Sequence, residues 1–105
     1  MYRATTPTHT FKLPIEADTC SIIRVTYKQG QNKLKKEKNS GGTSDGMTID
    51  GRNVTVVLTQ EETLQFEEGK TVTIQLRALT NAGAAFQSQK WRLPVEGALD
   101  EEVLE

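Results

Sequence analysis

The feature that most constrains this chain is an alternation of polar and apolar residues that runs from Thr71 to Ala78 in the segment Thr71–Leu79. Successive side chains of a strand point to opposite faces, so this segment is expected to have one apolar and one polar face. The apolar positions are Val72, Ile74, Leu76 and Ala78. The segment Arg52–Leu58 repeats the pattern. Two such one-sided strands must bury their apolar faces, most simply against other strands of the same chain. The pattern therefore predicts a small all-β domain.

Strand-like segments recur along the chain at short intervals and are separated by turn signals. They are His9–Leu13, Ser21–Lys28, Gln31–Lys38, Met47–Ile49, Arg52–Leu58, Thr71–Leu79 and Ala85–Val95. This spacing leaves no room for crossover helices, and it predicts an immunoglobulin-like antiparallel β-sandwich of about seven strands. A small, partly open β-barrel is the alternative.

A capping-box sequence follows the strand that ends at Leu58. In it, Thr59 can accept a hydrogen bond from the amide of Glu62, whose side chain can reach back to the Thr59 amide. We therefore expect one short helical turn at residues 60–65. Leu64 and Phe66 would then close this end of the core.

The segment Gln31–Lys38 carries four lysines and a single apolar residue, Leu34. This composition is typical of an edge strand that charge protects from further pairing. It has no aromatic residues for base stacking and no arginine to grip bases, which argues against contact with nucleic acid. The next segment, Asn39–Gly46, is rich in glycine and serine and is expected to be a flexible loop.

In the last expected strand, the apolar residues do not all fall on the same face. Phe86 falls on one face, whereas Trp91, Leu93 and Val95 fall on the other. A β-bulge between Gln87 and Lys90 would re-aim the strand and place all four side chains inside.

A chain of 105 residues is expected to form one domain. Residues 1–8, with Pro7, are expected to be an extended N-terminal arm, residues 9–95 the β-sandwich, and residues 96–105 an acidic C-terminal tail. Leu99, Val103 and Leu104 could form an apolar stripe if the tail were helical, and the tail would then dock on its own domain or on another chain. The candidate interaction residues are Tyr2, Arg3, Leu99, Val103 and Leu104.

Several classes of function are not expected from the composition. The formal net charge is −1, from 13 basic and 14 acidic residues, so no long-range field favours nucleic acid or an anionic membrane. The only histidine, His9, and the only cysteine, Cys20, are interpreted as packing residues. We therefore expect no enzyme, metal or cofactor, and no small-molecule ligand. No signal peptide or membrane span is evident, which predicts a protein that is kept in a cytoplasm or released only by lysis.

Several motifs resemble small proteins of unassigned activity encoded by prophages of Gram-positive bacteria. They are Arg3-Ala4-Thr5-Thr6-Pro7-Thr8-His9-Thr10-Phe11, Val25-Thr26-Tyr27-Lys28-Gln29-Gly30, the stretch Leu58–Phe66, Ile74-Gln75-Leu76-Arg77 and the acidic run Asp100–Leu104. Size and strand pattern are also similar to the immunoglobulin-like domain of siphophage baseplate upper proteins, which is a likeness of fold alone.

The resemblance implies a non-enzymatic structural or accessory protein of a prophage or phage particle, of the tail or baseplate type. Its partners would be other phage structural proteins or further copies of itself, and its place would be the bacterial host cytoplasm or the virion. The alternative is a ligand-binding β-sandwich that recognises a surface glycan or protein through the loop at residues 39–46.

Overall fold

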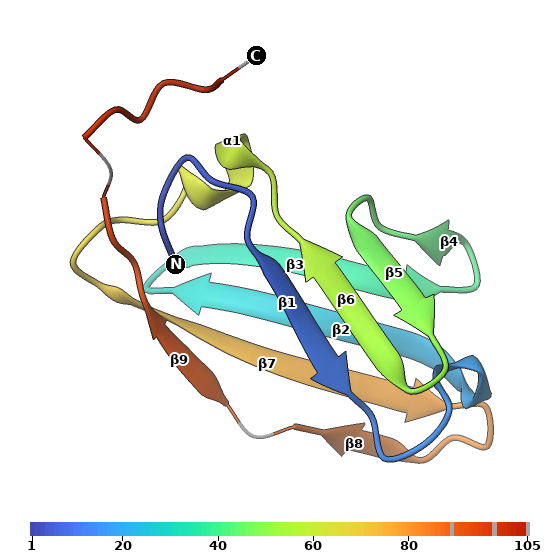
Figure 1. Cartoon of the computed structure of the whole chain (residues 1–105). Helices are drawn as coiled ribbons and strands as arrows, with labels where there is room; N and C mark the ends of the chain where they lie inside the picture. The colour runs from blue at the N-terminus through green and yellow to red at the C-terminus, as the bar shows by residue number, and fades with distance from the viewer. Residues whose placement is uncertain (89, 98, 105) are drawn as a thin grey trace.

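The computed structural model describes residues 1–88, 90–97 and 99–104, and it consists mainly of antiparallel strands (Figure 1). In chain order the elements are β1 (Thr8–Lys12), the 3₁₀ turn η1 (Ala17–Thr19), β2 (Cys20–Gln29), β3 (Asn32–Asn39), β4 (Gly42–Thr43), β5 (Met47–Asp50), β6 (Asn53–Val57), α1 (Gln60–Thr63), β7 (Thr71–Thr80), β8 (Ala85–Gln87) and β9 (Trp91–Pro94).

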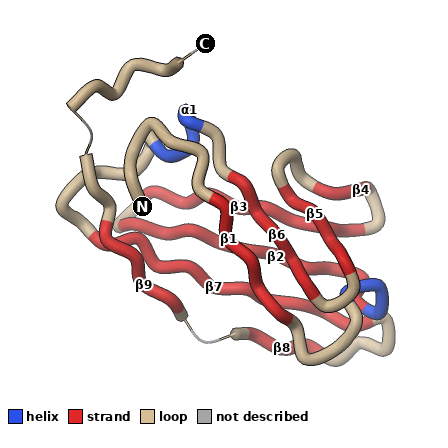
Figure 2. The backbone as a smooth tube through the Cα atoms, viewed as in Figure 1, coloured by secondary structure: helices blue, strands red, loops and turns tan. Residues whose placement is uncertain are grey.

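The strands form two sheets that pack face to face (Figure 2). The smaller sheet has the order β1-β6-β5, and the larger has the order β4-β3-β2-β7, with β8 and β9 both paired to β7. The chain changes sheet between β1 and β2, between β4 and β5, and between β6 and β7. These crossings are of the Greek-key kind, which confirms the predicted immunoglobulin-like sandwich. Within the described ranges no strand pairing joins the two sheets, so the barrel alternative is wrong.

The apolar residues at the alternating positions of these strands form the core. The apolar positions of β7 are at most 3% exposed, and the inward positions of β2 and β6 are completely buried. The residues concerned are Ile23, Val25, Tyr27, Val54, Val56, Val72, Ile74, Leu76 and Ala78. Burying a side chain of this kind contributes roughly 1.5–3 kcal/mol, so these facing rows supply most of the stability of the fold.

The capping box is present and begins α1. The Glu62 amide donates to the Thr59 hydroxyl over 3.1 Å, and the Thr59 amide donates to the Glu62 carboxylate over 2.9 Å. The short helix carries the chain from the smaller sheet to the larger one. Phe66 follows it and is 1% exposed, as expected, whereas Leu64 is only half-buried.

The expected irregularity in the last strand separates β8 from β9. Phe86 lies opposite Ala78, and a continued register would place Lys90 opposite Ile74. Trp91 lies there instead, so one extra residue is accommodated between the two strands, as a β-bulge requires. Residue 89, on which part of this prediction falls, lies outside the described residues. The Trp91 ring packs against Phe11 with a centroid distance of 5.1 Å.

The structure corrects the interpretation of the segment at residues 39–46. This segment contains β4, which pairs with the end of β3, so it is more ordered than a flexible loop. Ser44 fixes the next turn, because its amide donates to the carbonyl of Glu37 and its hydroxyl accepts from the Glu37 amide. The glycine-rich composition indicates the turns of this segment but does not indicate the short strand between them.

Lysines of β3 fall on both faces of the larger sheet, which the expectation of a solvated edge did not include. Lys36 lies opposite Val25 and points inward, with its ammonium group 2.7 Å from Glu62 and 2.8 Å from the carbonyl of Asp45. The ammonium group of Lys38, also on this face, donates to the carbonyls of Ala17 and Cys20. Because each inward charge has a partner, the strand can carry lysine on a face that is otherwise apolar.

Gly46 lies where the chain enters β5 and has a φ of +82°. Its carbonyl accepts a hydrogen bond from the Val57 amide over 2.8 Å, which brings the two backbones together. A methyl group at this position would overlap the carbonyl oxygen of Val57. Glycine is therefore required here by backbone conformation and by space.

We expect Gly46→Ala to lower the free energy of unfolding by more than about 3 kcal/mol, because it adds a collision with rigid backbone to conformational strain. Gly83→Ala is the matched control, since Gly83 has a φ of +88° and open space around its Cα. It should cost only about 1–2 kcal/mol. Urea unfolding of both variants measures the difference, and equal losses would contradict the role of the Val57 contact.

Candidate functional site

The N-terminal segment, expected to be an extended arm, is docked on its own domain. The Met1 ammonium group donates to the Pro94 carbonyl over 2.7 Å, and the Arg3 amide donates to the Glu96 carbonyl over 2.9 Å. Tyr2 and Glu96 form a parallel β-bridge. The first residues therefore continue the larger sheet beyond β9 and lie against their own domain. The Tyr2 side chain is nevertheless 56% exposed, and its hydrogen bond to the Glu96 carboxylate raises the pKa of the phenol.

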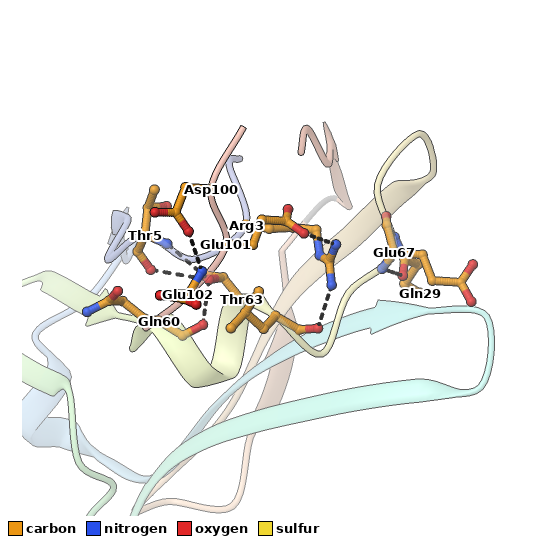
Figure 3. A network of polar contacts seen from close by, with 10 residues as sticks. Arg3, Thr5, Gln29, Gln60, Thr63, Glu67, Asp100, Glu101 and Glu102 are labelled. Carbon is orange, nitrogen blue, oxygen red and sulfur yellow. Dashed lines mark hydrogen bonds and ion pairs between the residues drawn. The ribbon is translucent and has the colours of Figure 1, made fainter. Parts of the chain in front are cut away.

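Arg3 connects this segment to the tail and to the end of α1 (Figure 3). Its guanidinium group forms a 2.7 Å ion pair with Glu101 and donates to the carbonyl of Leu64 over 3.2 Å. The structure thus brings together two of the regions that contain predicted interaction residues, at the end of the sandwich that carries α1.

The C-terminal tail does not form the proposed helical stripe. Residues 99–104 contain no helix, and ten residues with a run of acidic side chains are too few to sustain one alone. The Gln60 side chain instead holds the tail, donating to the Leu104 carbonyl over 3.0 Å and accepting from the Leu104 amide over 2.8 Å. Leu99 is fully exposed, Leu104 is 74% exposed and Val103 is half-buried. The tail is therefore held mainly through polar contacts, and its leucines face solvent.

A second surface, which we name the cationic face, covers the outer side of the larger sheet. It consists of Arg24, Lys28, Lys33, Lys35, Arg77, Lys90 and Arg92. Strand register places these residues side by side: Lys28 lies opposite Lys33 on one side and Thr73 on the other, and Thr73 lies opposite Arg92. Segments far apart in the sequence thus contribute to one positively charged surface.

The cationic face contains few compensating charges. Glu37 is the one carboxylate at the outward positions of the described strands of this sheet, and it pairs with Arg24 over 2.6 Å. Hydrogen bonds from Asn39 and then Arg24 lower the pKa of Glu37. Like charges directly opposite one another destabilise a sheet, yet Lys28 faces Lys33 and Arg24 faces Arg77. The fold therefore maintains an arrangement that is electrostatically unfavourable in the isolated chain.

The same face is hollowed in several places, and two of these hollows adjoin β2. A broad, open hollow of about 590 Å³ has cations and neutral polar groups around it, namely Thr26, Lys28, Gly30, Lys33, Thr71, Thr73, Gln75, Lys90 and Arg92. A smaller hollow of about 200 Å³ lies toward the opposite end of β2 and has a partly apolar lining of Ile22, Arg24, Arg77, Ala78, Leu79 and Ala85. The face can therefore contact negative groups and, beside them, an apolar side chain.

Sequence reasoning assigned the cations strand by strand and missed their convergence. The signal was available in the polar positions of the expected strands, because Arg24, Lys28 and Arg77 all fall on outward positions by parity. What the sequence did not provide was strand order, since β2 and β7, which pair at the centre of this face, are distant in the chain.

His9 and Cys20 occupy separate parts of the core. The His9 imidazole lies 2.8 Å from the hydroxyl of Tyr27, and burial, followed by repulsion from the N-terminal ammonium group, lowers its pKa. Cys20 begins β2, seven residues before Tyr27, which corresponds to about 23 Å along a strand. The geometry brings no thiol to the imidazole, and both residues pack as expected.

The glutamates of the capping box serve the local fold. Burial opposes ionisation of Glu62, but hydrogen bonds from Lys36 and from Thr59 outweigh it and lower the pKa of this carboxyl. Burial and then the charge of Glu62 raise the pKa of Tyr27. Among the described residues no group of three potential metal ligands converges.

No protein-family model matches this chain, and no curated protein is similar enough to it to indicate a relative. Within the described ranges, no helix has the length and apolar character needed to cross a membrane.

We expect Gln60→Ala to release the tail, because it removes both hydrogen bonds to the Leu104 backbone. Heteronuclear NOE values for residues 99–104 should fall, which reports faster motion on the picosecond to nanosecond timescale. Gln65→Ala is the control, since Gln65 is exposed and lies just beyond the same helix. Unchanged values in the Gln60 variant would show that other contacts hold the tail.

The lowered pKa of His9 predicts a stability change in mildly acidic solution. The unfolded chain takes up a proton below its ordinary pKa of 6.5, whereas the folded chain resists this, so the free energy of unfolding should fall as the pH drops below about 6.5. His9→Gln should remove this component. The contribution of Glu62, whose pKa is lowered from 4.5, is lost only at still lower pH. Urea unfolding of both proteins between pH 7.5 and pH 5, two values chosen to bracket about 6.5, would test this. Parallel curves would contradict the prediction.

Proposed function

We propose that this protein is a non-enzymatic structural or accessory component of a prophage or phage particle, of the tail or baseplate type. It acts by contact, and its cationic face binds an acidic surface of a partner protein. The observation that carries the contact role is the gathering of seven cations and one carboxylate on the outer side of one sheet. The phage setting depends on the resemblance of the sequence motifs to those of small prophage proteins.

The electrostatics of the cationic face favour a negatively charged partner. The six cations other than Arg24 have no ion-pair partner among the residues that the structure describes. An acidic partner would relieve the repulsion between Lys28 and Lys33 and supply the missing counter-charge. Charge complementarity of this kind mainly sets association rate and specificity.

The chemistry between the cations favours a protein partner over nucleic acid. The outward positions around Lys28 and Arg92 are filled by threonine and glutamine, namely Thr26, Thr71, Thr73 and Gln75. These groups exchange hydrogen bonds with peptide backbone and carboxylates. Sequence-tolerant binding of single strands instead uses aromatic platforms, and the aromatic rings of Tyr27 and Phe11 are turned into the core.

The proposal predicts that Lys28→Glu combined with Arg92→Glu abolishes binding to a fluorescein-labelled poly-L-glutamate peptide. Anisotropy at low salt should show the dissociation constant rising by more than about tenfold, because two attractive contacts become repulsive. Binding by the unmodified protein should also weaken steeply with salt, since the contacts are solvent-exposed.

The control is Lys12→Glu combined with Arg52→Glu, which changes net charge equally but lies on the smaller sheet and its β5–β6 turn. Arg52 pairs only loosely with Glu16, over 3.6 Å at an exposed site, so its loss should cost little. Equal loss of binding in both double variants would attribute the effect to net charge and overturn the proposal. Tighter binding to a duplex DNA than to poly-L-glutamate would overturn it in favour of nucleic acid.

A further inference from the structure

We infer that the acidic segment received by the cationic face is the C-terminal tail, residues 99–104, of a second copy of this chain. This inference rests on the proposed function, because it names the partner that the face would bind. Copies would then associate head to tail, or exchange tails within a pair.

The tail has the chemistry that the face lacks. It carries Asp100, Glu101 and Glu102 in succession, between Leu99 and the pair Val103 and Leu104. Glu101 is used within its own copy by Arg3, whereas Asp100 and Glu102 are exposed. A negative segment with exposed leucines thus projects from the same molecule that carries an uncompensated positive face.

The two leucines of the tail are exposed to solvent in the isolated chain. Leu99 has no cover, and Leu104 is held by its backbone while 74% of the residue stays exposed. Burying one leucine contributes roughly 1.5–3 kcal/mol, which favours a partner surface with an apolar hollow. The hollow beside Ile22, Leu79 and Ala85 supplies one, with Arg77 on its rim.

The lengths of the two surfaces also agree. Six extended residues span about 20 Å, and the outward row of β2 from Ile22 to Lys28 covers about 20 Å. With Leu99 in the apolar hollow, the following carboxylates lie over the cations of β2 and β7. Between described residues, the tail is held on its own domain by Gln60 with Leu104 and by Arg3 with Glu101. A partner surface that supplies polar contacts and also buries a leucine would favour release of the tail.

Sedimentation velocity of the full chain over a range of concentrations tests this at low and high salt. We expect association that grows with concentration at low salt and disappears at high salt. Asp100→Lys combined with Glu102→Lys should abolish it, as should Lys28→Glu combined with Arg92→Glu. An equimolar mixture of these two double variants should associate again, because the unmodified tail of the face variant can bind the unmodified face of the tail variant. Circular dichroism confirms that each variant is folded.

Gln60→Ala supplies an independent readout. If the tail must leave its own domain to bind a partner, removal of its internal contact should strengthen association several-fold. Weaker association in this variant, or no recovery in the mixture, would overturn the inference. Binding of poly-L-glutamate without self-association would overturn the tail as partner while leaving the proposed function intact. Failure of both measurements would overturn both.

Discussion

The pairing of β2 with β7 is the constraint on which the rest of the structure depends. These are the longest strands, and they run antiparallel in register from Lys28 and Thr73 to Ile22 and Leu79. Their inward residues form the centre of the core, and the smaller sheet packs over them. Because a strand alternates strictly, fixing the apolar residues inside also fixes the polar residues outside. One pairing therefore creates the core and aligns Arg24, Arg77 and Lys28 on the opposite face.

Positively charged side chains have different surroundings on the two faces of the larger sheet. The inward lysines of β3, Lys36 and Lys38, are matched with a carboxylate or with backbone carbonyls, since an unmatched charge inside would be costly. The outward cations lie in water, where repulsion is weak enough for core burial to outweigh it. A sheet can thus tolerate Lys28 opposite Lys33, although the arrangement contributes nothing to folding. Such a conflict between local and global preference is expected where a surface serves binding.

Much of the fold could be predicted from local patterns. The strands, the capping box at Thr59 and the irregularity before Trp91 each depend on neighbouring residues, so the sequence contained their causes. The tertiary roles of the ends could not be predicted in this way. Tyr2 pairs with Glu96 and Gln60 clamps Leu104, and these contacts join segments that no local pattern connects. The cationic face is an intermediate case. Alternation along each strand indicates which cations point outward, but only the order of the strands in the sheet shows that these cations lie side by side.

The net charge of the chain does not show that its positive and negative charges lie in separate regions. A value of −1 suggests a nearly neutral surface, yet the basic residues gather on one sheet face while the tail and the turn after α1 carry acidic side chains. Water and counter-ions screen opposite charges that are separated on one molecule, but the charges pair directly only when a segment bends back or a neighbouring molecule binds. The tail is bent back at Arg3 and Gln60, but these contacts lie at the α1 end of the sandwich and leave the cationic face unmatched. In the proposed association of copies, the acidic tail of one chain meets the cationic face of the next, and the exposed Leu99 adds an apolar contribution that electrostatics alone would not provide.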